Sequence, residues 1–178
     1  MLDRRITKKE FERIKNELKH KYVVNIYVYK NRPVFLGKEF VARTFVYNVK
    51  NGGQTIYIYK RKGYTELVVD MLHEIGHIID YRRYHKSKRW KDIDLNTDST
   101  VSTMNKKMKI FYIHIELMAE KNALAILKKM RIGDPQKHVF NSVLYLNNLI
   151  CSINGHKKNY IKNRTKMPTM RELKGKII

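Results

Sequence analysis

Acidic residues, cysteine and proline are all scarce in this sequence. The one cysteine, Cys151, excludes an intrachain disulfide and fits a reducing compartment. The N-terminal residues include no apolar segment of the kind found in signal peptides, and no apolar run approaches the roughly 20 residues that a membrane helix requires. These absences predict a soluble, cytoplasmic protein that does not insert into a membrane.

The shortage of acidic residues leaves a large positive charge. Lys and Arg number 38 against 16 Asp and Glu, so the formal net charge is +22. Such an excess favours polyanionic partners, such as nucleic acid or an acidic protein. The run from Arg82 to Lys91 intersperses six Lys or Arg with Tyr84 and Trp90, which is typical of a nucleic-acid contact but also of the basic C-terminal end of a helix. A solvated surface on a protein from a Lys-rich proteome would have the same composition, so charge alone leaves the partner open.

The sequence motif with the clearest chemistry is the pentapeptide His-Glu-Ile-Gly-His at residues 73–77. Residues i and i+4 of an α-helix lie about 40° apart around its axis and one turn apart along it, so both imidazoles can reach one metal ion. Zinc takes nitrogen ligands at about 2.0–2.1 Å in tetrahedral geometry, and His73 and His77 would supply two of them. Glu74 follows the first histidine and can take a proton from a metal-activated water.

The surroundings of the pentapeptide favour a metal site over a chance match. They are mostly apolar, and include Val68, Val69, Leu72, Ile75 and Ile79. Burying two histidines and a glutamate among such groups is costly unless a partner satisfies them. A metal ion would be that partner.

Hydrophobic periodicity predicts an α+β chain. The expected helices cover residues 7–20, 65–84, 100–131 and 135–152, and the expected strands cover 22–30, 40–49 and 55–59. Turn residues at 51–53 (Asn-Gly-Gly) predict a hairpin, so three antiparallel strands are expected before the metal helix. We expect one domain over residues 1–153 and a basic, loosely packed C-terminal tail at 154–178.

Helix ends are indicated by capping residues. Thr7 with Glu10 forms a capping-box pattern, and Thr65 is the expected N-cap of the metal helix. Asp134 before a proline predicts the start of the last long helix. A short turn in the tail is expected at residues 169–172, which repeat the capping-box pattern.

A catalytic zinc site has three protein ligands and one open position. The third ligand could be Glu116 or Glu120, one turn apart on the expected long helix, and His85 and His114 are further candidates. Glu120 is favoured because it lies among apolar residues, where an unpaired carboxylate is costly, and because Ala123 allows close packing against the metal helix. Glu116 has a similar setting and stays the alternative ligand.

An H-E-x-x-H helix followed by a second helix with Glu in an Ala-Glu-x-x-Ala setting resembles the gluzincin-type zinc metallopeptidases. Gly76, Asp80 and the tripeptide Met-Ala-Glu at 118–120 are similar to motifs of the anthrax-lethal-factor-like peptidases. The ImmA/IrrE-type metallopeptidases resemble the chain less closely, because they usually have a shorter gap between the two helices. The resemblance covers roughly residues 55–130 and implies a zincin-like α+β fold, with a small antiparallel sheet of about three strands packed on the metal-binding helix and further helices.

By position, the resemblance implies His73, His77 and Glu120 as zinc ligands and Glu74 as the general base. The lethal-factor-like group also has a tyrosine about two turns before the Glu ligand, which stabilises the oxyanion. Tyr112 is the nearest tyrosine and stands one residue from that spacing.

Two further roles are expected around the site. Zincins commonly pair an extended substrate with an edge strand ahead of the metal helix, and the strand that occupies this place consists of Thr55, Ile56, Tyr57, Ile58 and Tyr59. Asp80 lies on the helix face of the two histidines and could orient a ligand imidazole. It could equally form a helix-cap contact or a surface salt bridge with Arg82 or Arg83.

The sequence therefore supports the hypothesis of a zinc-dependent endopeptidase with one Zn²⁺ and a protein or peptide substrate. The alternative is a non-catalytic, zinc-containing nucleic-acid-binding protein that acts through its basic surface. Glu74 favours the enzyme, because a purely structural zinc site has no use for that carboxylate.

Overall fold

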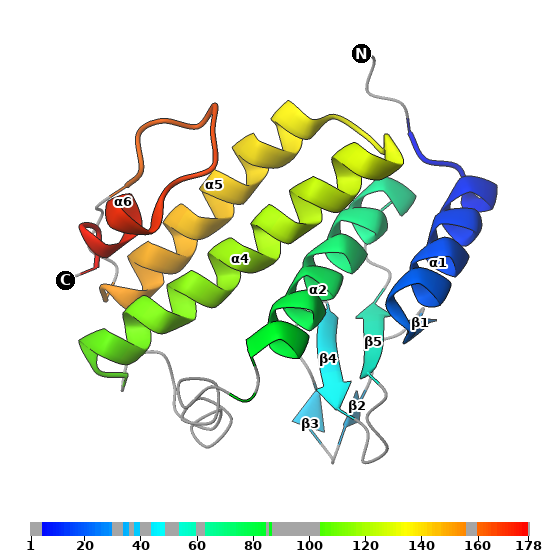
Figure 1. Cartoon of the computed structure of the whole chain (residues 1–178), viewed down its shortest axis with the longest axis horizontal. Coiled ribbons are helices and arrows are strands. Elements are labelled where there is room, and N and C mark those ends of the chain that lie inside the picture. Colours follow the sequence, from blue (N-terminus) through cyan, green and yellow to red (C-terminus); the bar gives the residue numbers. More distant parts are fainter. Residues whose placement is uncertain are drawn as a thin grey trace.

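The structure, a computed structural model, describes residues 5–29, 34–35, 38–39, 44–48, 54–59, 63–84, 86, 104–155 and 160–177 (Figure 1). The helices are α1 (Lys8–Tyr22), α2 (Tyr64–Tyr84), α4 (Lys106–Met130), α5 (Pro135–Ile153) and α6 (Met170–Lys174). The strands are β1 (Val24–Tyr29), β2 (Val34–Phe35), β3 (Lys38–Glu39), β4 (Thr44–Asn48) and β5 (Gln54–Tyr59). The chain is therefore of the α+β class, as predicted.

Three strands form one sheet in the order β1-β5-β4, and β2 and β3 form a separate antiparallel pair. β4 pairs antiparallel with β5, as expected of strands that flank a hairpin turn, although the turn itself at 51–53 lies outside the described residues. β1 pairs parallel with β5, with Ile26 opposite Ile56. The expected all-antiparallel sheet is therefore wrong, because β1 pairs with β5, the last strand in sequence, and the longer connection between them allows the two strands to run parallel.

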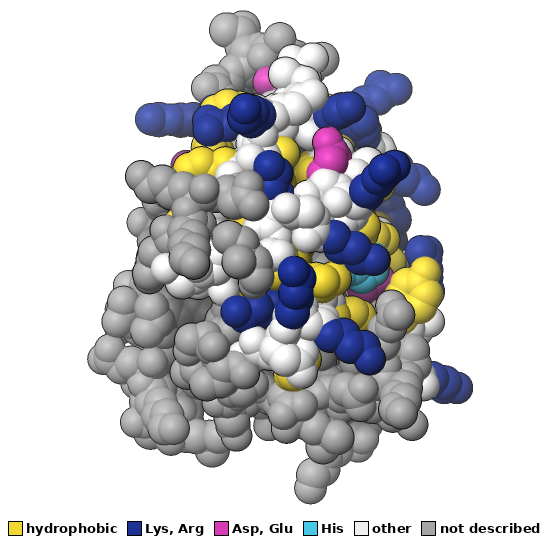
Figure 2. Space-filling view, turned by 90° about the vertical axis from the view of Figure 1, so that its left-hand side faces the viewer, with side chains coloured by type: hydrophobic (Ala, Val, Ile, Leu, Met, Phe, Trp, Pro, Cys, Tyr) yellow, Lys and Arg dark blue, Asp and Glu magenta, His cyan; other side chains and the backbone are white. Residues whose placement is uncertain are grey.

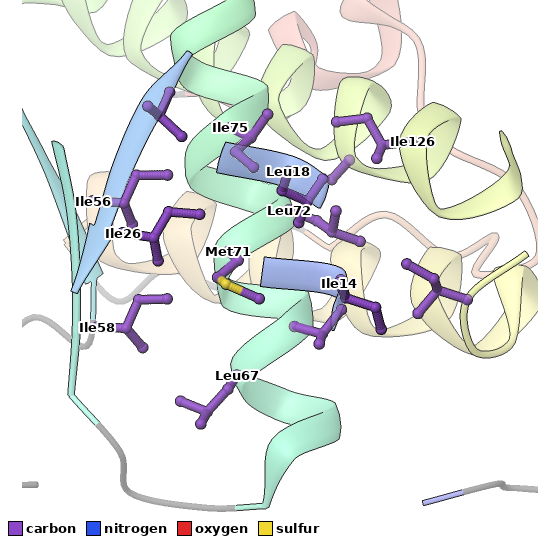
Figure 3. Packing of buried hydrophobic residues seen from close by; sticks show 14 of the residues in the cluster. Ile14, Leu18, Ile26, Ile56, Ile58, Leu67, Met71, Leu72, Ile75 and Ile126 are labelled. Carbon is purple, nitrogen blue, oxygen red and sulfur yellow. The ribbon is translucent and has the colours of Figure 1, made fainter. Parts of the chain in front are cut away.

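The sheet, α1, α2 and the C-terminal half of α4 enclose the first hydrophobic core (Figure 3). Alternate residues of β1 and β5, such as Ile26, Ile56 and Ile58, point at α2, where Met71 and Ile75 meet them. These five side chains are buried, and the period-2 pattern of the strands explains why one face of the sheet is apolar. The core fixes α2 against the sheet along most of its length.

A second hydrophobic core lies between α4, α5 and the C-terminal segment. Ile161, Leu173 and Ile177 of the tail are at most 5% exposed and pack with Leu117 and Leu146. The backbone of Ile161 is also held at both its N–H and its C=O by the side chain of Asn147. The described part of the tail is thus packed on the helices, which corrects the expectation of a loose tail: it has few apolar residues, but its isoleucines and its leucine are buried.

Most of the expected caps form. Thr7 and Glu10 make the capping box of α1, and Thr169 and Glu172 make that of α6. Thr65 is different: it lies inside α2, and its hydroxyl accepts a hydrogen bond from the backbone N–H of Ile6 rather than capping the helix. No helix among the described residues has the length and hydropathy that a membrane span requires.

Candidate metal centre

Two adjacent helices bring together a group that could hold a metal ion. α2 presents His73 and His77 one turn apart, and α4 presents Glu116 opposite them. The two Nε2 atoms are 3.0 Å apart, and they lie 3.4 Å (His73) and 3.6 Å (His77) from Glu116 Oε2. All three ligand atoms therefore face one point.

The spacing of these atoms fits a tetrahedral ion. A metal that binds nitrogen or oxygen at about 2.0–2.1 Å places neighbouring ligand atoms of a tetrahedron about 3.3 Å apart. The three separations of 3.0, 3.4 and 3.6 Å bracket this value. Three imidazole and carboxylate donors would leave the fourth corner of the tetrahedron open.

The approach of α2 to α4 depends on a glycine in the motif. A Cβ added at Gly76 would lie 2.3 Å from the carbonyl oxygen of Ala119, far inside van der Waals contact. The side-chain amide of Asn122 also donates a hydrogen bond to the carbonyl of Gly76. Two small residues thus let the helix backbones touch, and this contact places the α4 carboxylates within reach of the α2 imidazoles.

Glu120, the residue that the sequence favours as third ligand, contacts the other side of His73. Its Oε1 lies 2.9 Å from His73 Nδ1, whereas Glu116, the alternative candidate, faces the Nε2 atoms. An ionised carboxylate can only accept, so Nδ1 carries the proton and the lone pair of Nε2 is left for a metal. The geometry thus pairs Glu116 with the ligand position and Glu120 with the orientation of His73.

Three residues of α5 that the sequence did not single out hold the two carboxylates. Ser142 donates its hydroxyl to Glu120 Oε2, and His138 Nε2 lies 3.2 Å from the same oxygen. The hydroxyl of Tyr145 donates to Glu116 Oε2 over 2.7 Å. Positions 138, 142 and 145 share one face of a helix, and this spacing was the one signal in the sequence that could have shown them to act together.

Charge in the centre is balanced between carboxylates and imidazoles. Burial alone would raise the pKa of Glu116, but hydrogen bonds from His73 and His77 hold it well below its usual range. Burial would likewise raise the pKa of Glu120, but its contacts with His138 and His73 outweigh burial and hold the pKa well below its usual range. Burial lowers the pKa of His73, and the two glutamates outweigh that effect and raise it well above its usual value. Without a metal, the glutamates are thus ionised and draw a proton onto His73.

Glu74 and Tyr112 lie beside this group. Burial raises the pKa of Glu74, against the positive charges of His77 and His73. Tyr112 stands on α4 one turn before Glu116, and its pKa rises to about 12 because it is buried and because Glu116 and Glu74 are close. Tyr112 therefore keeps its proton at neutral pH and is available as a hydrogen-bond donor.

Asp80 is only 2% exposed and lies in the interior, whereas one of its expected roles was a salt bridge at the surface. Arg82, an expected partner, instead donates to Gln54 and to backbone carbonyls at the end of α1. Burial raises the pKa of Asp80, against the nearby charges of His114, His77 and Arg83, and its Oδ1 has no hydrogen-bond partner among the described residues. Its role in orienting a ligand imidazole stays a prediction.

The other expected site residues lie elsewhere. His114 is near Asp80 and does not belong to the group that could hold a metal, and His85 lies outside the described residues. Residues 55–59 form most of β5, which lies between β1 and β4. Both backbone edges of β5 are therefore paired, so the expectation that this strand is a free edge for a substrate is wrong. Within the described sheet, the edge strands are β1 and β4.

Comparison with known proteins assigns no family to this centre. No family model matches the sequence, and neither a curated protein nor a solved structure matches the chain.

Proposed function

We propose that this protein is a zinc-dependent endopeptidase. The observation that carries the proposal is the convergence of His73 Nε2, His77 Nε2 and Glu116 Oε2 on one point, with Glu74 next to them. Two imidazoles and one carboxylate are a donor set of catalytic zinc sites, which keep the fourth position open. A zinc ion bound there would lower the pKa of a water to about 7 and polarise the carbonyl of a substrate.

Glu74 has the properties of the general base. It directly follows the first histidine on α2, and burial raises its pKa above the usual value of a glutamate, which makes it a stronger base. In the proposed reaction it accepts a proton from the attacking water and transfers it to the amine that leaves the cleaved peptide bond. The carboxylate is thus used twice and returns to its starting state.

Two tyrosines near the centre, one on α4 and one on α5, have separate roles in the proposal. Tyr112 is protonated at neutral pH, and we propose that it donates a hydrogen bond to the oxyanion that forms on the substrate. Tyr145 already donates to Glu116. Its role is to hold that ligand, and it does not compete with Tyr112 for the substrate.

The proposal is tested by Glu74→Gln, assayed for zinc content and for hydrolysis of a quenched fluorescent peptide library. We expect about one zinc per chain in both proteins and a 10²–10⁴-fold lower rate in the variant, because Gln keeps the shape and cannot accept the proton. Glu66→Gln is the matched control, since it removes the same charge from an exposed position in the first turn of the same helix. Equal hydrolysis by wild type and Glu74→Gln would exclude Glu74 as the base, and wild-type protein that binds no zinc would exclude the proposal as a whole.

A further inference from the structure

The end of the molecule that holds the C-terminal segment is strongly cationic (Figure 2). In that view Lys and Arg side chains are spread across the face and acidic side chains are few. We call this surface the C-terminal cationic face. It consists of Lys106, Lys107, Lys109, Lys162, Arg164, Lys166, Arg171, Lys174 and Lys176, contributed by the first turns of α4 and by residues 160–177.

The acid in the C-terminal part of this face has a structural role. Between residues 160 and 177 the sequence has six cations and one acid, Glu172. The carboxylate of Glu172 accepts hydrogen bonds from the backbone N–H and the hydroxyl of Thr169, which completes the capping box of α6. The segment therefore has five more cations than acids.

The first turn of α4 adds cations where a helix least favours them. The N-terminal end of a helix carries partial positive charge, so acidic residues are the usual choice there. α4 has no acidic residue in its first turn and instead has Lys106, Lys107 and Lys109 within its first four residues. This arrangement costs stability in the isolated protein and becomes favourable when an anion is bound.

These charges are held on a fixed scaffold. α6 packs on α4 through the second core, in which Leu173 is fully buried. The side chain of Asn154 donates to the carbonyl of Lys176, and Asn147 pairs with the backbone of Ile161. The tail and the start of α4 therefore present their cations together, and a bound polyanion would not have to order the backbone that carries them.

Exposed aromatic rings border the face. The guanidinium of Arg164 lies 5.8 Å from the ring centre of Phe140, which is 42% exposed, and Tyr160 is 38% exposed. Aromatic rings and guanidinium planes next to cations are the groups on which unpaired bases stack. An acidic protein would need the cations and would make no such use of the rings.

We propose that the C-terminal cationic face binds nucleic acid, with its Lys and Arg on the phosphates and Phe140, Arg164 and Tyr160 against bases. A membrane surface fits less well, because the aliphatic side chains of Ile161, Leu173 and Ile177 are buried in the core and cannot enter lipid. The inference does not rest on the proposed zinc chemistry, and either can fail without the other.

The test measures binding of the full chain to a fluorescent 20-nucleotide single strand across a salt series. One variant changes Lys106, Lys162, Lys166 and Lys174 to Gln on the face. The control changes four lysines of α1, Lys8, Lys9, Lys19 and Lys21, to Gln, and α1 lies at the opposite end of the molecule (Figure 1). Both variants lose the same charge, so a difference between them reports position alone.

We expect binding by wild type that weakens steeply with salt, and at least 10-fold weaker binding by the face variant. The slope of log K against log salt should be less steep by up to about 3 in the face variant, since each lost phosphate contact on a single strand removes about 0.7 from its magnitude. The α1 control should stay within twofold of wild type. Absence of wild-type binding at low salt, or equal losses in the two variants, would overturn the proposal. Binding of poly-glutamate as tight as that of the oligonucleotide would assign the face to an acidic protein instead.

Discussion

The two sides of α4 contribute to the metal centre in different ways. On one side, α4 meets α2 through backbone contact between Gly76 and Ala119, and the α2 imidazoles face Glu116. On the other side, α4 meets α5 through polar side chains, where Ser142 and Tyr145 donate to Glu120 and Glu116. The contact with α2 brings the ligand atoms together, and the contact with α5 sets the direction in which the carboxylates point.

This difference shows how two identical side chains one turn apart come to have different roles. Glu116 and Glu120 are both buried carboxylates on the same helix face. Tyr145 contacts the oxygen of Glu116 that faces the Nε2 atoms, whereas Ser142 and His138 contact the oxygen of Glu120 that faces away from His73. The partners on α5, rather than the position on α4, distinguish the carboxylate proposed as a ligand from the one proposed to orient His73.

The largest effect, a loss of stability, is expected from a side chain placed between α2 and α4. Gly76→Ala would place a Cβ 2.3 Å from the carbonyl oxygen of Ala119, and backbone atoms cannot move aside as a flexible side chain can. We expect a loss of about 3 kcal/mol in the free energy of unfolding, measured in urea, with a melting temperature about 6–12 °C lower. Gly175→Ala is the control, because its nearest atom would be 3.6 Å away and the change should be within about 1 kcal/mol of neutral. Equal stability of the two variants would mean that the helices are not in contact at Gly76.

The α2 side of the centre could be predicted from the sequence because its signal is local. His73, Glu74 and His77 lie on one helix, so helix geometry alone fixes their relative positions. Gly76 falls inside the same motif. Ala119 and Ala123, at helical spacing on the second helix, indicated that this helix could approach closely.

The α5 side could not be predicted, because it depends on contacts between residues far apart in sequence. Ser142 and Tyr145 are common residue types on a helix that reads as ordinary and amphipathic, and no motif connects them with Glu120 or Glu116. The choice between the two glutamates depends on these contacts: the sequence favoured Glu120, whereas it is Glu116 that groups with His73 and His77. The parallel pairing of β1 with β5 escaped prediction for the same reason: strand patterns predict strands but not their partners.

The roles of the two carboxylates can be separated by zinc affinity. Glu116→Gln should abolish stoichiometric zinc binding, because a neutral amide is a poor replacement for a carboxylate ligand. Glu120→Gln should keep one zinc per chain with an affinity about 10–100-fold lower, since Gln still offers an oxygen to the N–H of His73. Competition with a chromophoric chelator gives both affinities. The reverse order of effects would make Glu120 the ligand and Glu116 the orienting residue.

The smallest effect on zinc affinity is expected from Tyr145→Phe. This substitution tests the contribution of α5 alone. The phenylalanine keeps the ring that lies edge-on to His73, 5.7 Å between ring centres, and removes only the hydroxyl that donates to Glu116. Without this bond Glu116 can rotate away from the two Nε2 atoms, so we expect about 10-fold weaker zinc binding with little change in the melting temperature. Tyr112→Phe removes a hydroxyl from the same neighbourhood and should leave the zinc affinity unchanged, because Tyr112 is proposed to act on the substrate. If both variants bind zinc as wild type does, the backbone contact with α2 is sufficient to form the centre, and α5 serves only to cover it.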